Sequence, residues 1–228
     1  MNLKLESYID HTILKPEATA DQIDRLCDEA LQFRFAAVCV NPVWVARCVR
    51  RLASGGSGGP VVCTVAGFPL GASLPEMKSA EARKAVEQGA LEVDMVVNMG
   101  ALIAGERGAV TADIAAVVAA TKRANERASV KVILETRALT DEQIILGCRC
   151  LAEAQADYVK TSTGFHPNGG ATVEHVALLR KHASPLKVKA AGGIRDLKSA
   201  LAMIAAGADR LGMSASVAVL MEHMATNG

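Results

Sequence analysis

The stretch Ala156-Asp157-Tyr158-Val159-Lys160-Thr161-Ser162-Thr163-Gly164 is a short apolar run that carries one lysine and then passes into hydroxyl side chains and a glycine. Tyr158 and Val159 are typical of a β-strand. A buried ammonium group loses its hydration at a large cost in free energy, so Lys160 is expected at the end of this strand, facing a site. A lysine at a strand terminus can also reach solvent without any catalytic role, and this stretch alone does not separate the two interpretations.

A second lysine repeats the pattern in Leu186-Lys187-Val188-Lys189-Ala190-Ala191-Gly192-Gly193-Ile194-Arg195. Neighbouring strands of a parallel sheet lie about 4.8 Å apart, so Lys160 and Lys189 are expected within several ångströms of each other. At about 5 Å and an effective dielectric constant near 20, their repulsion is roughly 3 kcal/mol, which lowers a lysine pKa by about 2 units. The pair therefore predicts that one of the two amines is a usable nucleophile near neutral pH, and Lys160 is the first candidate.

Strand and helix patterns alternate along the whole chain. Strands are expected at 8–12, 36–40, 61–66, 92–98, 130–135 and 209–213 and around the two lysines, and helices at 22–32, 43–53, 75–88, 110–127 and up to 154. This alternation calls for a parallel sheet, and a strand count near eight predicts an α/β fold, a closed (β/α)8 TIM barrel that spans residues 1–228 as a single domain. The alternative is an open doubly wound sheet, but no GxGxxG motif follows the first strand.

The composition limits the partners that the chain can have. The 25 basic and 24 acidic side chains give a net charge of +1, so no overall field favours nucleic acid or a membrane. No apolar run approaches the roughly 18 residues that a membrane span requires. The six cysteines form no zinc-type CxxC pair and are expected to be reduced thiols of a cytoplasmic protein.

Glycine-rich segments follow the last two strands of the predicted barrel, at Gly192-Gly193-Ile194-Arg195 and at Gly212-Met213-Ser214-Ala215-Ser216. Barrels of this class often hold phosphate in these two loops, with backbone N–H groups and the start of a short helix. Glycine lets the backbone approach an anion closely, while Arg195 adds charge and Ser214 a hydroxyl. The two loops together predict a phosphate site.

Carboxylates stand in or at the ends of several strands. Asp94 lies in an otherwise apolar strand, where it is expected to pair with a lysine, either to transfer protons or as a structural ion pair. Asp10 is a weaker candidate of the same kind, and Glu135 is a candidate salt-bridge partner in the barrel mouth.

Cys39 is a thiol near a strand end, for which burial without reactivity is the more common outcome. The five histidines show no HExxH spacing, so neither a metal nor another cofactor is expected.

Taken together, these segments resemble the deoxyribose-phosphate aldolase family across nearly the whole chain and in the right order. The resemblance rests on Asp10-His11-Thr12, Leu14-Lys15-Pro16, Val38-Cys39-Val40-Asn41-Pro42, Gly67-Phe68-Pro69-Leu70-Gly71, Glu92-Val93-Asp94-Met95-Val96-Val97-Asn98, and the two lysine motifs. Some members end in a tyrosine that reaches the site, whereas the tyrosines of this chain are Tyr8 and Tyr158.

The resemblance implies a metal-independent class I aldolase that reversibly cleaves 2-deoxy-D-ribose 5-phosphate to acetaldehyde and D-glyceraldehyde 3-phosphate, and a homo-oligomer, either a dimer or a tetramer. It implies that Lys160 forms the Schiff base and that Asp94 and Lys189 relay protons. Phosphate binding would fall on Gly164, Gly192, Gly193, Arg195, Gly212 and Ser214. Two alternatives stay open: another Schiff-base barrel enzyme, such as a transaldolase-like or ketose-phosphate aldolase, and a phosphate-binding barrel without catalytic activity.

Overall fold

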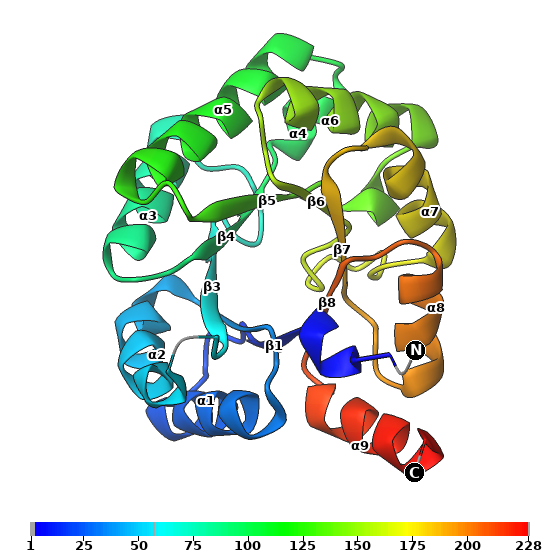
Figure 1. Ribbon diagram of the computed structural model, residues 1–228. Coiled ribbons are helices and arrows are strands. Elements are labelled where there is room, and N and C mark those ends of the chain that lie inside the picture. Colours follow the sequence, from blue (N-terminus) through cyan, green and yellow to red (C-terminus); the bar gives the residue numbers. More distant parts are fainter. Residues whose placement is uncertain (1–2, 57, 228) are drawn as a thin grey trace.

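A computed structural model describes residues 3–56 and 58–227. Over these residues, eight parallel strands close into a barrel in chain order, and β1 pairs with both β2 and β8 (Figure 1). Closure excludes the open doubly wound sheet and confirms the predicted (β/α)8 barrel. The strands are β1 (Ile9–Ile13), β2 (Ala37–Val40), β3 (Val61–Ala66), β4 (Glu92–Val96), β5 (Ser129–Ile133), β6 (Tyr158–Lys160), β7 (Lys187–Ala191) and β8 (Arg210–Met213).

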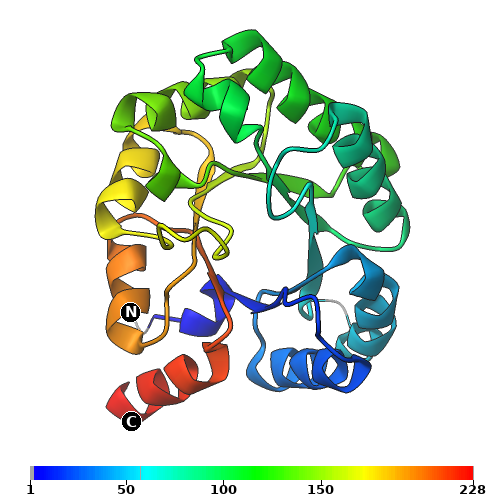
Figure 2. The same cartoon turned by 180° about the vertical axis from the view of Figure 1, so that it is seen from behind.

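Helices surround the strands as an outer ring, which is seen from both ends of the barrel (Figures 1 and 2). They are α1 (Ala20–Phe33), α2 (Val45–Leu52), α3 (Pro75–Glu87), α4 (Met99–Ile103), α5 (Arg107–Ala124), α6 (Asp141–Glu153), α7 (Val173–His182), α8 (Leu197–Ala205) and α9 (Ser216–Asn227). Short 3-10 helices lie at Leu5–Tyr8, Pro42–Trp44, Ala53–Gly55 and Thr136–Ala138. No helix among the described residues is long and apolar enough to cross a membrane.

Local capping explains where the predicted helices begin. Thr19 and Thr140 each cap a helix, and in both cases the glutamine three residues later completes a capping box. Such caps satisfy backbone N–H groups that have no partner inside the helix. The sequence offers Thr19 or Asp21 as the cap of the helix expected over 22–32, and Thr140-Asp141-Glu142-Gln143 as the N-terminal signal of the helix expected up to about 154. The structure places both caps on threonine, and α1 begins two residues before the expected position.

Other boundaries differ from the predictions for identifiable reasons. The helix expected over 43–53 begins as the 3-10 helix Pro42–Trp44 and becomes α2 only at Val45. The strand expected over 92–98 ends at Val96, because Asn98 turns the chain and its side chain accepts a hydrogen bond from the N–H of Ala101, which starts α4. The sequence patterns give no boundaries for α4, α7, α8 or α9.

The barrel interior is divided between an apolar and a charged half. Ala37, Cys39, Cys63 and Val65 of β2 and β3 pack together on one side. The remaining strands place charged side chains inside, all of them buried: Asp10, Glu92, Asp94, Lys131, Lys160, Lys189 and Arg210. Barrels of this class usually fill the interior with branched aliphatic side chains, so this charged half marks a functional region.

Candidate active site

A pocket of about 410 Å³ opens at the carboxyl ends of the strands. Its walls come from the ends of β1, β6, β7 and β8 and from the loops that follow them. Parallel strands bring these chain segments to one face of the barrel, although they are far apart in the sequence. The lining residues are Thr12, Ile13, Leu14, Lys15, Lys160, Thr163, Gly164, Phe165, Ala191, Gly192, Gly193, Ile194, Arg195, Gly212, Met213 and Ser214.

Lys160 is the last residue of β6, lines the pocket and is 2% exposed. Its Nζ lies 2.6 Å from Oδ2 of Asp94. The next residue fixes the strand end, because Thr161 Oγ1 donates a hydrogen bond to the carbonyl of Ala191 at 3.2 Å and accepts one from its N–H at 3.0 Å. Lys160 therefore lies at the end of its strand and faces the pocket, as the sequence indicates.

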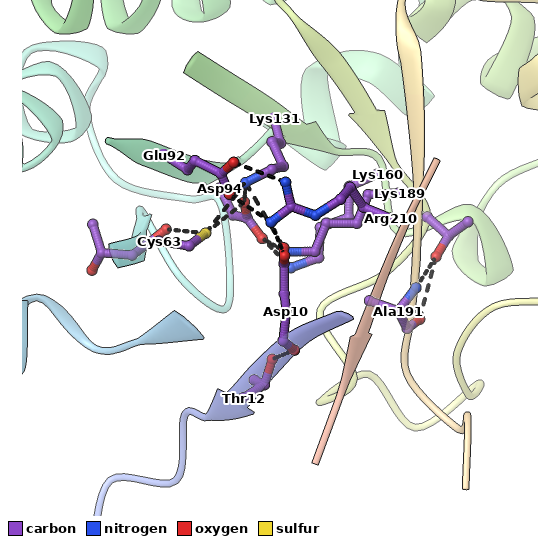
Figure 3. A network of polar contacts seen from close by, with 12 residues as sticks. Asp10, Thr12, Cys63, Glu92, Asp94, Lys131, Lys160, Lys189, Ala191 and Arg210 are labelled. Carbon is purple, nitrogen blue, oxygen red and sulfur yellow. Dashed lines mark hydrogen bonds and ion pairs between the residues drawn. The ribbon is translucent and has the colours of Figure 1, made fainter. Parts of the chain in front are cut away.

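Asp94 is fully buried at the centre of the charged cluster (Figure 3). Its Oδ2 accepts hydrogen bonds from Lys160 and Lys189, each at 2.6 Å, and its Oδ1 accepts them from Lys131 and from the thiol of Cys63, each at 3.2 Å. Burial alone would raise the pKa of Asp94, but the charges of the three lysines outweigh burial and hold this pKa well below its usual value. The carboxylate is therefore ionised at neutral pH.

Lys189 is held between two carboxylates. Its Nζ lies 2.5 Å from Oδ2 of Asp10 and 2.6 Å from Oδ2 of Asp94. Burial lowers the pKa of Lys189, but Asp10 and Asp94 outweigh burial and raise it well above the usual value. The sequence prediction of two ammonium groups facing each other is therefore too simple, because Lys160 and Lys189 meet through the oxygen of a carboxylate.

A deeper group of charges was missed from the sequence. Lys131 Nζ lies 2.6 Å from Glu92 Oε2, and Arg210 contacts both Glu92, with Nη1 2.9 Å from Oε1, and Asp10. Glu92, Lys131 and Arg210 lie in the same network of polar contacts as Asp94 (Figure 3). One signal was available: Glu92 precedes Asp94 by two residues and so points to the same side of β4.

Glu135 lies just beyond β5 in the left-handed backbone conformation, with φ of 60°. Such a conformation is strained for a residue other than glycine and is often found at functional sites. Its Oε2 accepts hydrogen bonds from Oγ1 of Thr163 at 2.5 Å and from the N–H of Thr163 at 3.1 Å. The prediction of a salt bridge is not met, since Glu135 contacts no cation within 4.0 Å among the described residues. It holds the hydroxyl of a pocket residue instead.

The glycine-rich end of the pocket is built by close backbone packing. Gly192 has φ of +86°, and a Cβ there would lie 2.9 Å from Cα of Gly170 in the loop that follows β6. Gly193 has φ of +81° and nothing within 4 Å of an added Cβ. These two conformations leave room for an anion beside the backbone. All six predicted phosphate-site residues line this pocket: Gly164, Gly192, Gly193, Arg195, Gly212 and Ser214.

Cys39 does not line the pocket; it is buried in the apolar half of the interior. Its sulfur, that of Cys63 and a carboxylate oxygen of Asp94 lie within 4.8 Å of one another, an arrangement that could in principle hold a metal ion. The ammonium of Lys131 already occupies this place, 3.4 Å from Cys63 Sγ and 3.2 Å from Asp94 Oδ1. A cation would be repelled there, so these residues do not fit a metal.

The fold and the site together define a class of protein: a (β/α)8-barrel enzyme with a buried lysine at its mouth, suited to carbonyl chemistry. Comparison with known proteins specifies the class further, because the model of the DeoC/LacD family of aldolases matches residues 5–221. The chain belongs to this family, which confirms the resemblance inferred from the sequence.

Relatives match over almost their whole length. The deoxyribose-phosphate aldolase of Brevibacillus brevis is 53% identical over 96% of each chain, and that of Streptococcus gordonii is 50% identical over 98% of this chain and 99% of the relative. Among solved structures, the tetrameric deoxyribose-phosphate aldolase of Aeropyrum pernix is 34% identical with a TM-score of 0.88, over 97% of this chain and 92% of that chain.

Proposed function

We propose that this protein is a class I aldolase that reversibly cleaves 2-deoxy-D-ribose 5-phosphate to acetaldehyde and D-glyceraldehyde 3-phosphate. The observation that carries the proposal is the 2.6 Å contact between Lys160 and Asp94 at a pocket that also holds the glycine-rich loops. An amine beside a carboxylate suits Schiff-base chemistry, and loops of this kind suit a phosphate. The names of the relatives support the choice of sugar.

In the cleavage direction, the neutral amine of Lys160 attacks the aldehyde carbon of the open-chain sugar. The carbonyl oxygen takes up protons and leaves as water, which gives an iminium. The C3 hydroxyl then loses its proton, and the C2–C3 bond breaks as its electron pair moves into the iminium to form an enamine. Glyceraldehyde 3-phosphate departs. A proton is added to the enamine carbon, and water hydrolyses the resulting imine to acetaldehyde and the free amine.

Asp94 and Lys189 are the groups that we assign to the proton transfers. They are hydrogen-bonded to each other at 2.6 Å, and Asp94 also bonds Lys160, so a proton can move between these three groups and a bound water. A positioned acid or base contributes about 10²- to 10⁴-fold to a rate. The reaction uses no metal in this scheme, and a chelator should leave the rate unchanged.

The phosphate of the substrate is assigned to the six glycine-loop residues described above. Backbone N–H groups at Gly192 and Gly193 and the N-terminus of α9, which begins at Ser216, favour a negative charge. Arg195 is exposed beside them and adds a cation. This end of the pocket would hold the sugar with its aldehyde carbon toward Lys160.

A homo-oligomer, either a dimer or a tetramer, is a further part of the proposal. Leu70, Leu74 and Met77, at the start of α3 and in the loop before it, are between 58 and 72% exposed. Large apolar side chains grouped in this way often mark a contact with another protein. The tetrameric Aeropyrum pernix relative supports a second copy of the chain as the partner. A cytoplasmic location agrees with the six cysteines, all of them free thiols.

Trapping with borohydride tests the central step. Acetaldehyde and sodium borohydride should leave a reduced two-carbon adduct on Lys160, located by peptide mass spectrometry, and Lys160→Ala should abolish both adduct and turnover. A panel of aldose and ketose phosphates, assayed with and without EDTA, would show whether deoxyribose 5-phosphate is preferred. An adduct on Lys189 would show that Lys189 forms the Schiff base and that Lys160 takes part in proton transfer. Active enzyme without any adduct would exclude the covalent mechanism.

A further inference from the structure

Lys131 lies in the barrel interior below Lys160 and is fully buried. Its Nζ contacts Glu92 Oε2 at 2.6 Å, Asp94 Oδ1 at 3.2 Å and the sulfur of Cys63 at 3.4 Å. It therefore holds the side of the Asp94 carboxylate that faces away from Lys160. Because Oδ1 is occupied in this way, Oδ2 is the oxygen that faces Lys160 and Lys189.

Charge is not balanced in the connected cluster. Hydrogen bonds and ion pairs join four cations and three carboxylates within the part of the chain that the structure describes: Lys131, Lys160, Lys189, Arg210, Asp10, Glu92 and Asp94. An unpaired buried charge is costly in free energy. With all seven groups ionised, the cluster carries one positive charge more than its negative charges can balance. Loss of one proton from a cation is therefore favoured.

The contacts indicate which cation carries the excess proton. Lys131, Lys189 and Arg210 each lie within 4.0 Å of at least two carboxylates. Lys160, among the described residues, lies within 4.0 Å of Asp94 alone, through an oxygen that it shares with Lys189. The positive and negative charges of the cluster are equal in number when Lys160 is the neutral amine. This is the form that attacks a carbonyl.

We propose that Lys131 is a positioning residue for the reaction: its fixed charge, placed on the far side of Asp94, keeps Lys160 in the unprotonated form. This inference rests on the proposed function, since it concerns the amine that forms the Schiff base. Burial lowers the pKa of Lys131, but Asp94 and the groups around it outweigh burial and raise this pKa well above its usual value. Lys131 therefore stays charged over the pH range in which the enzyme would work.

Charged and titratable groups from every neighbouring strand face this region. They are Asp10 on β1, Cys39 on β2, Cys63 on β3, Glu92 and Asp94 on β4, Lys131 on β5 with Glu135 beyond its end, Tyr158 and Lys160 on β6, Lys189 on β7 and Arg210 on β8. The ring centre of Tyr158 lies 5.6 Å from Nζ of Lys131. Lys131 and Glu92 can be replaced as a pair without removing a group that contacts Lys160. After Lys131 is replaced, Glu92 keeps Arg210 as its partner, with Nη1 to Oε1 at 2.9 Å.

The test compares the pH dependence of Lys160 reactivity in three variants. Lys131→Met removes a cation, so the acid limb of kcat/KM and of borohydride trapping should move up by about one to two pH units. Glu92→Gln removes an anion and should move the limb down. The double variant again has one more cation than carboxylates in the cluster. It should therefore return the acid limb of the pH profile to its original position. Lys122→Met, which removes a cation paired with Asp157 on the outside of the barrel, is the control and should leave it unchanged.

Several outcomes would overturn the inference. If Lys131 only supports the fold, the melting temperature falls while the pH limb stays in place and the double variant restores nothing. If Lys131→Met does not fold, two other measurements still test the inference. They are the downward shift of the acid limb in Glu92→Gln and the position of the acid limb in the double variant. Absence of any trapped lysine in the unmodified protein would reject the proposed function instead, so the two failures are distinguishable.

Discussion

Lys160 and Lys189 share a single oxygen atom, Oδ2 of Asp94, and each ammonium nitrogen lies 2.6 Å from it. This arrangement joins the proposed nucleophile and its proton donor through one carboxylate. It allows Lys189 to stay charged, because Asp10 is its second partner at 2.5 Å. Among the described residues, Lys160 has Asp94 as its one carboxylate partner within 4.0 Å.

Replacing Asp94 with Asn tests the carboxylate as part of the proton relay. The amide keeps the size of the side chain but removes its negative charge, so kcat should fall by about 10²- to 10⁴-fold. Circular dichroism should show a folded protein, because Asp10 still pairs with Lys189 and Glu92 with Lys131. Loss of the folded signal would instead assign Asp94 a structural role, and a kcat within threefold of the original would exclude it from catalysis.

The sequence predicts the barrel and the upper part of the site for a clear physical reason. Lys160, Lys189 and Asp94 are charged residues in short apolar strands, where a charge needs a partner. Parallel strands bring their carboxyl ends to the same face, so residues that are far apart in the chain meet there. The double glycine after Lys189 likewise marks the place where the backbone needs positive φ angles, which Gly192 and Gly193 adopt.

The deeper charges are harder to predict from the sequence. Barrel strands are buried on both faces, so the alternation that identifies an interior face in other sheets is weak in Val130-Lys131-Val132-Ile133. Arg210 could equally have pointed toward the helices. The partners of each cation also depend on the stagger of the strands, which places Asp94 beside Lys131 and Val65. No local pattern contains this information.

Replacing Arg195 with Ala tests the phosphate end of the pocket. In the unmodified enzyme, deoxyribose without phosphate should have a far lower kcat/KM than its 5-phosphate. The variant should narrow this gap, mainly by raising KM for the phosphorylated sugar about 10- to 100-fold, since a hydrogen bond to a charged group contributes about 1.5 to 3 kcal/mol. Steady-state kinetics with both sugars provides the measurement. Equal kcat/KM for the two sugars in the unmodified enzyme would contradict the phosphate site.

Replacing Glu135 with Gln tests whether this residue orients the hydroxyl of Thr163. Thr163 Oγ1 donates to Glu135 and accepts from the N–H of Phe165 at 3.0 Å, which leaves it an acceptor toward the pocket. A glutamine amide can reverse the direction of the first bond, so kcat/KM should fall about 10-fold or more. Thr163→Val should give a similar loss, and the double variant should lose little more. Additive losses would show that the two residues act independently.

Replacing the two exposed apolar residues Leu74 and Met77 with Glu tests the proposed contact between copies. Both side chains are more than half exposed in the single chain, so the change should cost little in folding stability but should prevent an apolar interface from forming. Light scattering after size-exclusion chromatography should show a dimer or tetramer for the unmodified protein and a monomer for the variant. An unchanged assembly would place the interface elsewhere on the barrel.

Folding stability should depend on pH through His11. This ring contacts Ser216 Oγ at 2.9 Å and Glu29 Oε2 at 2.7 Å, and it packs against Phe35 with the ring centres 5.2 Å apart. Burial lowers the pKa of His11 below its ordinary value of 6.5, and the contact with Glu29 only partly offsets this. The unfolded chain therefore takes up a proton more readily than the folded protein. Stability is complete above pH 6.5 and falls as the pH drops below that value toward the folded pKa.

His11→Phe should remove this dependence, because phenylalanine keeps the ring packing against Phe35 but does not titrate. Melting temperatures measured between pH 7.5 and about 5.5 should fall more steeply in the unmodified protein than in the variant. Below about pH 4 both proteins should lose stability together, because Asp10 and Asp94 have lowered pKa values and their contribution disappears once these carboxylates are protonated. Parallel curves over the upper range would mean that His11 is not the group that titrates there.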